Sequence, residues 1–299
     1  GNPADGIDGW RLDVAFCVGH PFWKDWRKFL KAINPDAYIT AEIVDKIEAN
    51  EPYLRGDEFD AVMNYNFLFI CAEYFIQKKD KITVSQFDTL LKQLREAFPK
   101  GVSEVMQNLL DSHDTNRLLS FIKNGDIHNI RDWGKFFEKT QVGSGSGYDF
   151  SKPGDEERKI QKLMALMQLT YIGAPMIYYG DEAGMWGGND PDCRKPMLWP
   201  EFQYDDETFA PDQSKITASK VEFDRDLFEY YKKLISIRNS SEALRKGSYK
   251  TLDACTEKDI FVFERESGNE KLIIILNNSN SMAEYELPAA SDMMDLVTG

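Results

Sequence analysis

Two charged residues that could do chemistry together lie in one short stretch, residues 8–15. Arg11 and Asp13 are two positions apart and alternate with apolar residues, so a strand here would place both charges on one face. An unpaired buried charge is costly, and arginine offers a planar, two-pronged donor to a carboxylate. By itself, the stretch therefore fits a structural ion pair at the end of a strand.

Two further carboxylates follow later predicted strands. Glu42 lies in the β-branched stretch 37–44, and Asp114, with His113 beside it, follows the strand predicted at 105–110. Three carboxylates that meet at the ends of neighbouring strands repel each other, unless they bind a metal ion or act as acid and base with different pKa values. Glycoside hydrolysis needs such a set. The residues alone leave a carbohydrate hydrolase and a metal-dependent carboxylate site both open.

The elements that must position these residues alternate along the chain. We expect strands at residues 9–15, 37–44, 59–67, 105–110 and 174–179, and helices at residues 21–33, 85–98, 156–171 and 224–238. Such alternation predicts parallel βα units, with polar residues after the strands as at the C-terminal face of a (β/α)8 barrel. No glycine fingerprint for a nucleotide follows a strand, which argues against a doubly wound sheet.

The pattern changes near the C-terminus. Short strands without intervening helices are predicted at residues 249–252, 260–265, 272–276 and 282–287, and long polar loops before them at 124–155 and 183–222. We therefore predict the C-terminal part of a catalytic barrel at residues 1–243. A small antiparallel β-sandwich, an all-β domain, is predicted at residues 244–299.

Charge and composition restrict the partners. The formal net charge is −14, which argues against nucleic acid or an anionic membrane surface, whereas a neutral sugar is compatible with it. The four cysteines are scattered without a CxxC motif, and there are three histidines, so neither a disulfide framework nor a zinc site is predicted. The sequence has no run of about 18 apolar residues, so no transmembrane helix is predicted.

Four segments resemble conserved segments of the α-amylase family of glycoside hydrolases, in the family's order. They are GWRLDVA at 9–15, AEI at 41–43, LLDSHDTNR at 109–117 and MWGGNDPDCRKPM at 185–197. The last is similar to a loop of the neopullulanase, cyclomaltodextrinase and maltogenic amylase branch. The resemblance covers nearly the whole chain and implies an α/β fold. It corresponds to a partial (β/α)8 TIM barrel, strands 4–8, followed by the small β domain.

The resemblance implies a role for each motif residue. Asp13 would be the nucleophile that forms a covalent glycosyl-enzyme, and Glu42 the general acid and then the base. Asp114 would bind hydroxyls of the distorted sugar ring, helped by His113. Arg11 would orient Asp13 and keep its pKa low.

Substrate-binding roles are implied for the loop at 185–197. Asp190 and Arg194 would contact sugars on the non-reducing side, and Trp186 would stack on a sugar. Each has a structural alternative, since an Asp and an Arg four apart can brace a loop and a tryptophan can pin one. Asp181 is expected to be bound within the last βα loop rather than to act in catalysis.

The implied activity is retaining hydrolysis of α-1,4, and potentially α-1,6, glucosidic bonds. The substrates would be maltooligosaccharides, cyclomaltodextrins, pullulan or starch. A transglycosylase of the same family and a non-catalytic carbohydrate-binding or assembly relative are the alternatives. No cofactor is expected to be required, and a structural calcium ion or an oligomer is compatible with the family. The compartment, bacterial cytoplasm, periplasm or exterior, is left open.

Two departures from the family pattern bear on specificity and completeness. Phe16 and Cys17 stand where the branch usually has Asn-Glu, and Val44 and Asp45 where Trp-His is common. Both changes concern the subsites that receive the leaving group. The family's first conserved segment is absent, and strands four to eight alone would leave sheet edges open. We therefore expect a fragment whose activity depends on the N-terminal half of the barrel.

Overall fold

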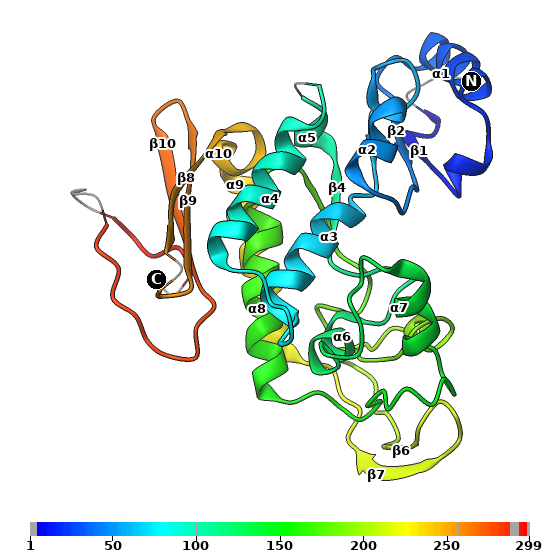
Figure 1. Ribbon diagram of the computed structural model, residues 1–299, viewed down its shortest axis with the longest axis vertical. Helices are drawn as coiled ribbons and strands as arrows, with labels where there is room; N and C mark the ends of the chain where they lie inside the picture. Colours follow the sequence, from blue (N-terminus) through cyan, green and yellow to red (C-terminus); the bar gives the residue numbers. More distant parts are fainter. Residues whose placement is uncertain (1–4, 100, 256, 288–292, 298–299) are drawn as a thin grey trace. The chain divides into compact units, whose positions relative to one another are not determined.

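The computed structural model describes residues 5–99, 101–255, 257–287 and 293–297 (Figure 1). The chain divides into two compact units. The N-terminal unit comprises Gly1–Ile70, Thr89–Leu109 and Ile172–Met176, and the C-terminal unit comprises Cys71–Asp88, Leu110–Tyr171 and Ile177–Gly299. Two of the boundaries follow strands, at Leu109 and Met176, and two fall within helical segments, at Ile70 and Asp88.

Parallel strands form the centre of the N-terminal unit. They are β1 (Gly9–Leu12), β2 (Tyr38–Ala41), β3 (Ala61–Val62), β4 (Gln107–Leu109) and β5 (Ala174–Met176). The pairs β1–β2, β2–β3 and β4–β5 are parallel, and a parallel bridge between Met63 and Gln107 links the end of β3 to β4. The five predicted strands therefore follow one another in chain order, as expected for successive βα units.

Helices connect these strands. They are η2 (Ala15–Cys17), α1 (His20–Ile33), α2 (Ile47–Asn50), η3 (Glu51–Leu54), α3 (Tyr65–Cys71), the π-helical η4 (Ala72–Ile76), α4 (Val84–Glu96) and α5 (Val102–Val105). Pro21 lies in the first turn of α1, where its missing N–H leaves no bond unmade. The buried Trp23 of α1 donates its indole N–H to the carbonyl of Ala15 at 2.9 Å, which fixes the segment after β1.

The strand expected at 59–67 is wrong over most of its length. Only Ala61–Val62 is a strand, and a helix begins at Tyr65. The Asn64 side chain accepts a hydrogen bond from the backbone N–H of Phe67 at 3.2 Å, the contact made by a residue that caps a helix N-terminus. A short polar cap thus overrides the β-like run of apolar residues around it.

The C-terminal unit contains the remaining helices and strands. They are α6 (Leu118–Lys123), α7 (Trp133–Thr140), α8 (Asp155–Thr170), η5 (Asp192–Arg194), β6 (Glu207–Phe209), β7 (Lys215–Ser219), α9 (Arg225–Ser240), α10 (Glu242–Lys246), β8 (Ser248–Cys255), β9 (Ile260–Ser267) and β10 (Glu270–Asn277). Helices α8 and α9 share an apolar core that includes Leu169, Leu227 and Leu234. This core supports the loops that carry the candidate site residues of the unit.

Both predicted polar loops contain regular structure. Helix α7 interrupts the loop at 124–155, because Phe136 is buried and packs on Phe121 with ring centroids 5.2 Å apart. The antiparallel pair β6–β7 interrupts the loop at 183–222. A few apolar residues within a polar segment are enough to dock a short helix, and composition alone conceals them.

The C-terminal strands form an antiparallel sheet in the order β8–β9–β10 (Figure 1). Arg265 of β9 donates to the carbonyl of Thr170 at the end of α8, at 2.8 Å. The strand expected at 282–287 is wrong, because these residues form neither a helix nor a strand. Met282 is fully exposed and Leu287 is 39% exposed, so these apolar side chains do not form a buried face. Across the described part of the chain, no helix is long and apolar enough to span a bilayer.

Candidate active site

Three of the predicted residues come together in the N-terminal unit, where we call them the N-terminal cluster: Arg11, Asp13 and Glu42. Arg11 Nη1 donates to Asp13 Oδ1, and Arg11 Nη2 lies 2.7 Å from Glu42 Oε1. The parallel register explains the contact, because Arg11 is opposite Thr40 and Glu42 lies two residues beyond. One guanidinium therefore bridges two carboxylates that come from neighbouring strands.

The backbone after β1 supplies a second donor to Glu42. The N–H of Val14 donates to Glu42 Oε2 at 3.1 Å. Val14 has φ 45°, a left-handed conformation that is rare for a β-branched residue. Glu42 is buried, whereas the Asp13 side chain is 69% exposed. The acid is held by fixed donors, and the aspartate is open to an incoming molecule.

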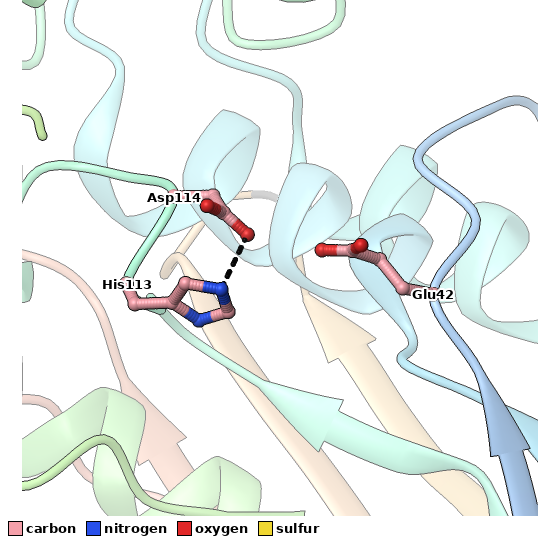
Figure 2. A group of neighbouring side chains, drawn as sticks. All are labelled: Glu42, His113 and Asp114. Atoms are coloured by element: carbon pink, nitrogen blue, oxygen red, sulfur yellow. Dashed lines mark ion pairs between the residues drawn. The ribbon is translucent and has the colours of Figure 1, made fainter. Parts of the chain in front are cut away.

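Four further predicted residues meet in the C-terminal unit, where we call them the C-terminal cluster: His113, Asp114, Asp190 and Arg194. Figure 2 shows the ion pair between His113 Nε2 and Asp114 Oδ2, at 3.0 Å. Arg194 Nη2 lies 3.6 Å from the other oxygen of Asp114. Asp114 is thus approached by the His113 ring and the Arg194 guanidinium, and its side chain remains one-third exposed.

Asp190 and Arg194 form a two-pronged pair. Arg194 Nε and Nη2 lie 2.7 and 3.2 Å from the two carboxylate oxygens of Asp190. The hydrogen bond that Arg194 donates to Asp190 raises the pKa of the Arg194 guanidinium. Because Arg194 also faces Asp114, the pair orients one arginine toward the residue expected to bind sugar hydroxyls. The bracing role and the sugar-contacting role are therefore compatible in this geometry.

A tight turn presents His113 and Asp114. The N–H of Ser112 donates to Thr115 Oγ1 at 2.9 Å, and the N–H of Asp114 donates to Ser112 Oγ at 3.1 Å. The turn ends at Arg117, whose N–H donates to the carbonyl of Gly187 at 3.1 Å. Both ends of the segment are thereby tied to the interior of the unit.

Comparison with known families places this chain. The model of the alpha amylase catalytic domain matches residues 3–247, more than half of the sequence. The chain belongs to the alpha-amylase family. The family match spans every residue of both clusters and ends in the segment just before β8.

Individual relatives agree with this assignment. A cyclomaltodextrinase from Geobacillus thermopakistaniensis is 37% identical over 297 residues, 98% of this chain and 41% of the relative. Neopullulanase 2 from Thermoactinomyces vulgaris is 35% identical, over 91% of this chain and 37% of its own length. A solved cyclomaltodextrinase structure superposes with a TM-score of 0.68 at 37% identity, covering 91% of this chain and 37% of that one. The chain thus spans about two fifths of these relatives.

Trp186 of this alpha-amylase family chain is buried, with 4% of its surface exposed. Its indole N–H donates to Glu207 at 3.0 Å, and the ammonium groups of Lys152 and Lys195 lie 5.5 and 5.7 Å from its ring. This environment favours the alternative in which the ring pins the loop, and sugar stacking stays a prediction. Burial also raises the pKa of the nearby Cys193 thiol to about 12, which keeps it protonated.

Sequence reasoning missed three contributions to the site. The sequence predicted that Arg11 pairs with Asp13 but did not predict its second partner, Glu42. Both residues lie at the ends of neighbouring parallel strands, and this placement could have indicated the contact. The backbone N–H of Val14 has no signature in side-chain type. The buried Arg117 also went unassigned, because its contacts come from segments distant in sequence.

Proposed function

We propose that this chain carries the catalytic residues of a retaining glycosidase acting on α-1,4, and potentially α-1,6, glucosidic bonds. The substrates would be maltooligosaccharides, cyclomaltodextrins, pullulan or starch. The observation that supports this is Arg11, which contacts an exposed carboxylate, Asp13, and a buried one, Glu42. Two carboxyl groups in contrasting environments are what a nucleophile and a general acid require.

The chemistry follows from these environments. Asp13 attacks the anomeric carbon while Glu42 gives its proton to the departing glycosidic oxygen, which leaves a covalent glycosyl-enzyme. Glu42, now ionised, removes a proton from water, which attacks the same carbon and releases Asp13 with net retention. The pairing of Glu42 with Arg11 and the Val14 N–H stabilises its ionised form between the two steps.

The C-terminal cluster would bind the substrate. His113 and Asp114 donate to and accept from hydroxyls of the distorted ring, and Asp190 and Arg194 hold sugars further along the non-reducing side. Hydrogen bonds that strengthen as the ring flattens lower the barrier rather than only improving affinity. Neutral sugars suit a site in which each aspartate is already paired with an arginine or histidine side chain.

Transglycosylation is a second candidate. Phe16, which follows the nucleophile strand, is 55% exposed, and an apolar surface near the leaving-group side favours a sugar acceptor over water. Product analysis with cyclomaltodextrin, pullulan and starch separates the two reactions, because transfer gives products longer than the substrate.

We also propose that the five parallel strands are strands four to eight of the barrel, and that activity depends on the others. Large apolar residues around β1 and on α1 support this, with Trp10 41%, Phe22 56% and Phe29 69% exposed. The test is hydrolysis of maltotriose by residues 1–299 alone and together with the N-terminal part of the Geobacillus relative. Full activity of the chain alone would overturn the fragment proposal, and inactivity of both forms would overturn the assigned reaction.

A further inference from the structure

Two aspartates and an arginine are buried together in the C-terminal unit. Asp111 and Arg117 begin and end the segment that carries His113 and Asp114, and Asp181 follows β5. Asp111, Asp181 and Arg117 are 1%, 3% and 0% exposed. Two ionised carboxylates against one guanidinium would leave a net buried negative charge, which is strongly unfavourable.

Hydrogen bonding within this buried group is incomplete. Asp111 Oδ2 accepts from the N–H of Leu118 at 2.8 Å, but among the described residues Oδ1 of Asp111 and Oδ1 of Asp181 have no donor, and Nε and Nη2 of Arg117 have no acceptor. Burial raises the pKa of both carboxyl groups, and a side-chain hydrogen bond between them contributes to each shift. Two carboxylates carry no hydrogen to donate, so such a bond needs one proton, and that proton satisfies both groups.

We propose that Asp111 and Asp181 share one proton in the folded chain and that this shared proton fixes segment 111–117. Both aspartates are then positioning residues for Asp114, a role that rests on the proposed function. With the proton in place, the charges of the pair and of Arg117 cancel. Arg117 lies 4.0 Å from Asp181 and donates to the carbonyl of Tyr179 at 2.6 Å, which ties the segment to the loop after β5.

The electrostatic surroundings favour retention of the proton. Burial raises the pKa of Asp111, and burial together with repulsion from Asp111 raises the pKa of Asp181 well above its ordinary range. Glu182 adds repulsion, and Arg117 opposes it. Burial also raises the pKa of the Tyr231 hydroxyl and the Cys193 thiol near the pair, so both stay neutral and neither adds a further negative charge.

The shared proton makes the stability of the folded chain depend on pH. The unfolded chain releases this proton near the ordinary aspartate pKa of about 3.9, whereas the folded chain keeps it to higher pH. The stability that this proton contributes is therefore fully present below pH about 3.9, and it is lost as the pH rises toward the pKa of the pair in the folded chain. Across that window the folding equilibrium constant falls by up to about tenfold per pH unit for this pair.

The direct test is difference infrared spectroscopy of residues 1–299 at neutral pH. We expect the C=O stretch of one protonated carboxylic acid, which disappears in both Asp181→Asn and Asp111→Asn. Asp25→Asn, which alters an aspartate whose side chain is 80% exposed, serves as the matched control and keeps the band. Absence of the band in the unmodified chain, or its persistence in both pair variants, would overturn the proposal.

A second measurement covers a failure of either variant to fold. Asp181→Asn donates an amide hydrogen to Asp111 without a titratable proton, so its unfolding free energy should depend less on pH above about 4 than that of the unmodified chain. Equal slopes would contradict the shared proton. In an active form of the enzyme, Asp181→Asn should move the alkaline limb of kcat/KM. If Asp181→Asn loses the infrared band but leaves the alkaline limb of kcat/KM unchanged, only the positioning role is refuted. The assignment of the proton does not depend on activity.

Discussion

Arg11 and Arg117 each serve two carboxyl groups, but with opposite consequences. Arg11 is about one-third exposed and directly bonded to both of its partners, Asp13 and Glu42. Arg117 is fully buried, and its nearest contact to Asp181 is 4.0 Å, with Tyr178 and Tyr179 rings 4.7 and 4.6 Å from its guanidinium. The Asp13 carboxylate at Arg11 is 69% exposed and reaches solvent, whereas burial at Arg117 makes the proposed shared proton part of the structure.

An arginine with two carboxyl groups can have two different roles, depending on whether the group is exposed or buried. An arginine between two acids near solvent leaves a carboxylate available for reaction. The same set in the interior serves to hold a segment in place. Substitutions at the two arginines should therefore separate activity from stability.

The largest expected effect is on turnover at the N-terminal cluster. Asp13→Asn removes the proposed nucleophile and Glu42→Gln the proposed proton donor, so each should lower kcat by about 10²–10⁴-fold or more in an active form of the enzyme. The measurement is initial-rate hydrolysis of maltotriose. Near-normal turnover in either variant would refute its assigned role.

Arg117→Met should act on stability first. Removing the buried Arg117 guanidinium leaves the negative charge of the aspartate pair uncompensated, which typically costs about 3–5 kcal/mol of unfolding free energy. Urea unfolding of residues 1–299 measures the loss. Arg11→Met is the matched comparison, and because its ion pairs are partly exposed we expect a change of about 1 kcal/mol or less. Equal destabilisation by both substitutions would contradict the proposal that Arg117 contributes mainly to stability and Arg11 mainly to activity.

Asp190→Asn and Arg194→Lys should affect substrate binding more than stability. Their ion pair is exposed, so its loss should cost at most about 1 kcal/mol of stability. If the pair holds sugars, KM for maltooligosaccharides should rise while kcat changes less. A pure bracing role predicts unchanged KM, which steady-state kinetics on substrates of increasing length would reveal.

The smallest effect should come from removing metal ions. The carboxyl groups of both clusters are paired with arginine or histidine side chains, so we propose that no metal ion is required for turnover. Activity should survive exhaustive dialysis against a chelator. Loss of activity that calcium restores, without a change in melting temperature, would favour the metal-dependent alternative.

Much of the fold could be predicted from local patterns. Helices α1, α4, α8 and α9 begin and end within two residues of the predicted bounds, because apolar residues at helical spacing and their caps are local signals. The strand at 59–67 and the strand at 282–287 were wrong for physical reasons that lie outside these patterns. Asn64 caps a helix, and the apolar residues around Met282 find no surface to cover.

The sequence by itself determined which residues could react, because acid, base and arginine types in motif order restrict the chemistry. Only the tertiary structure decided their charge state and partners. The parallel register brings Arg11 to Glu42, and the Val14 turn aims a backbone N–H at the same carboxylate. Burial alone separates Asp111 and Asp181 from Asp13, although all are aspartates after strands. Burial and register depend on contacts between distant segments, which no local pattern encodes.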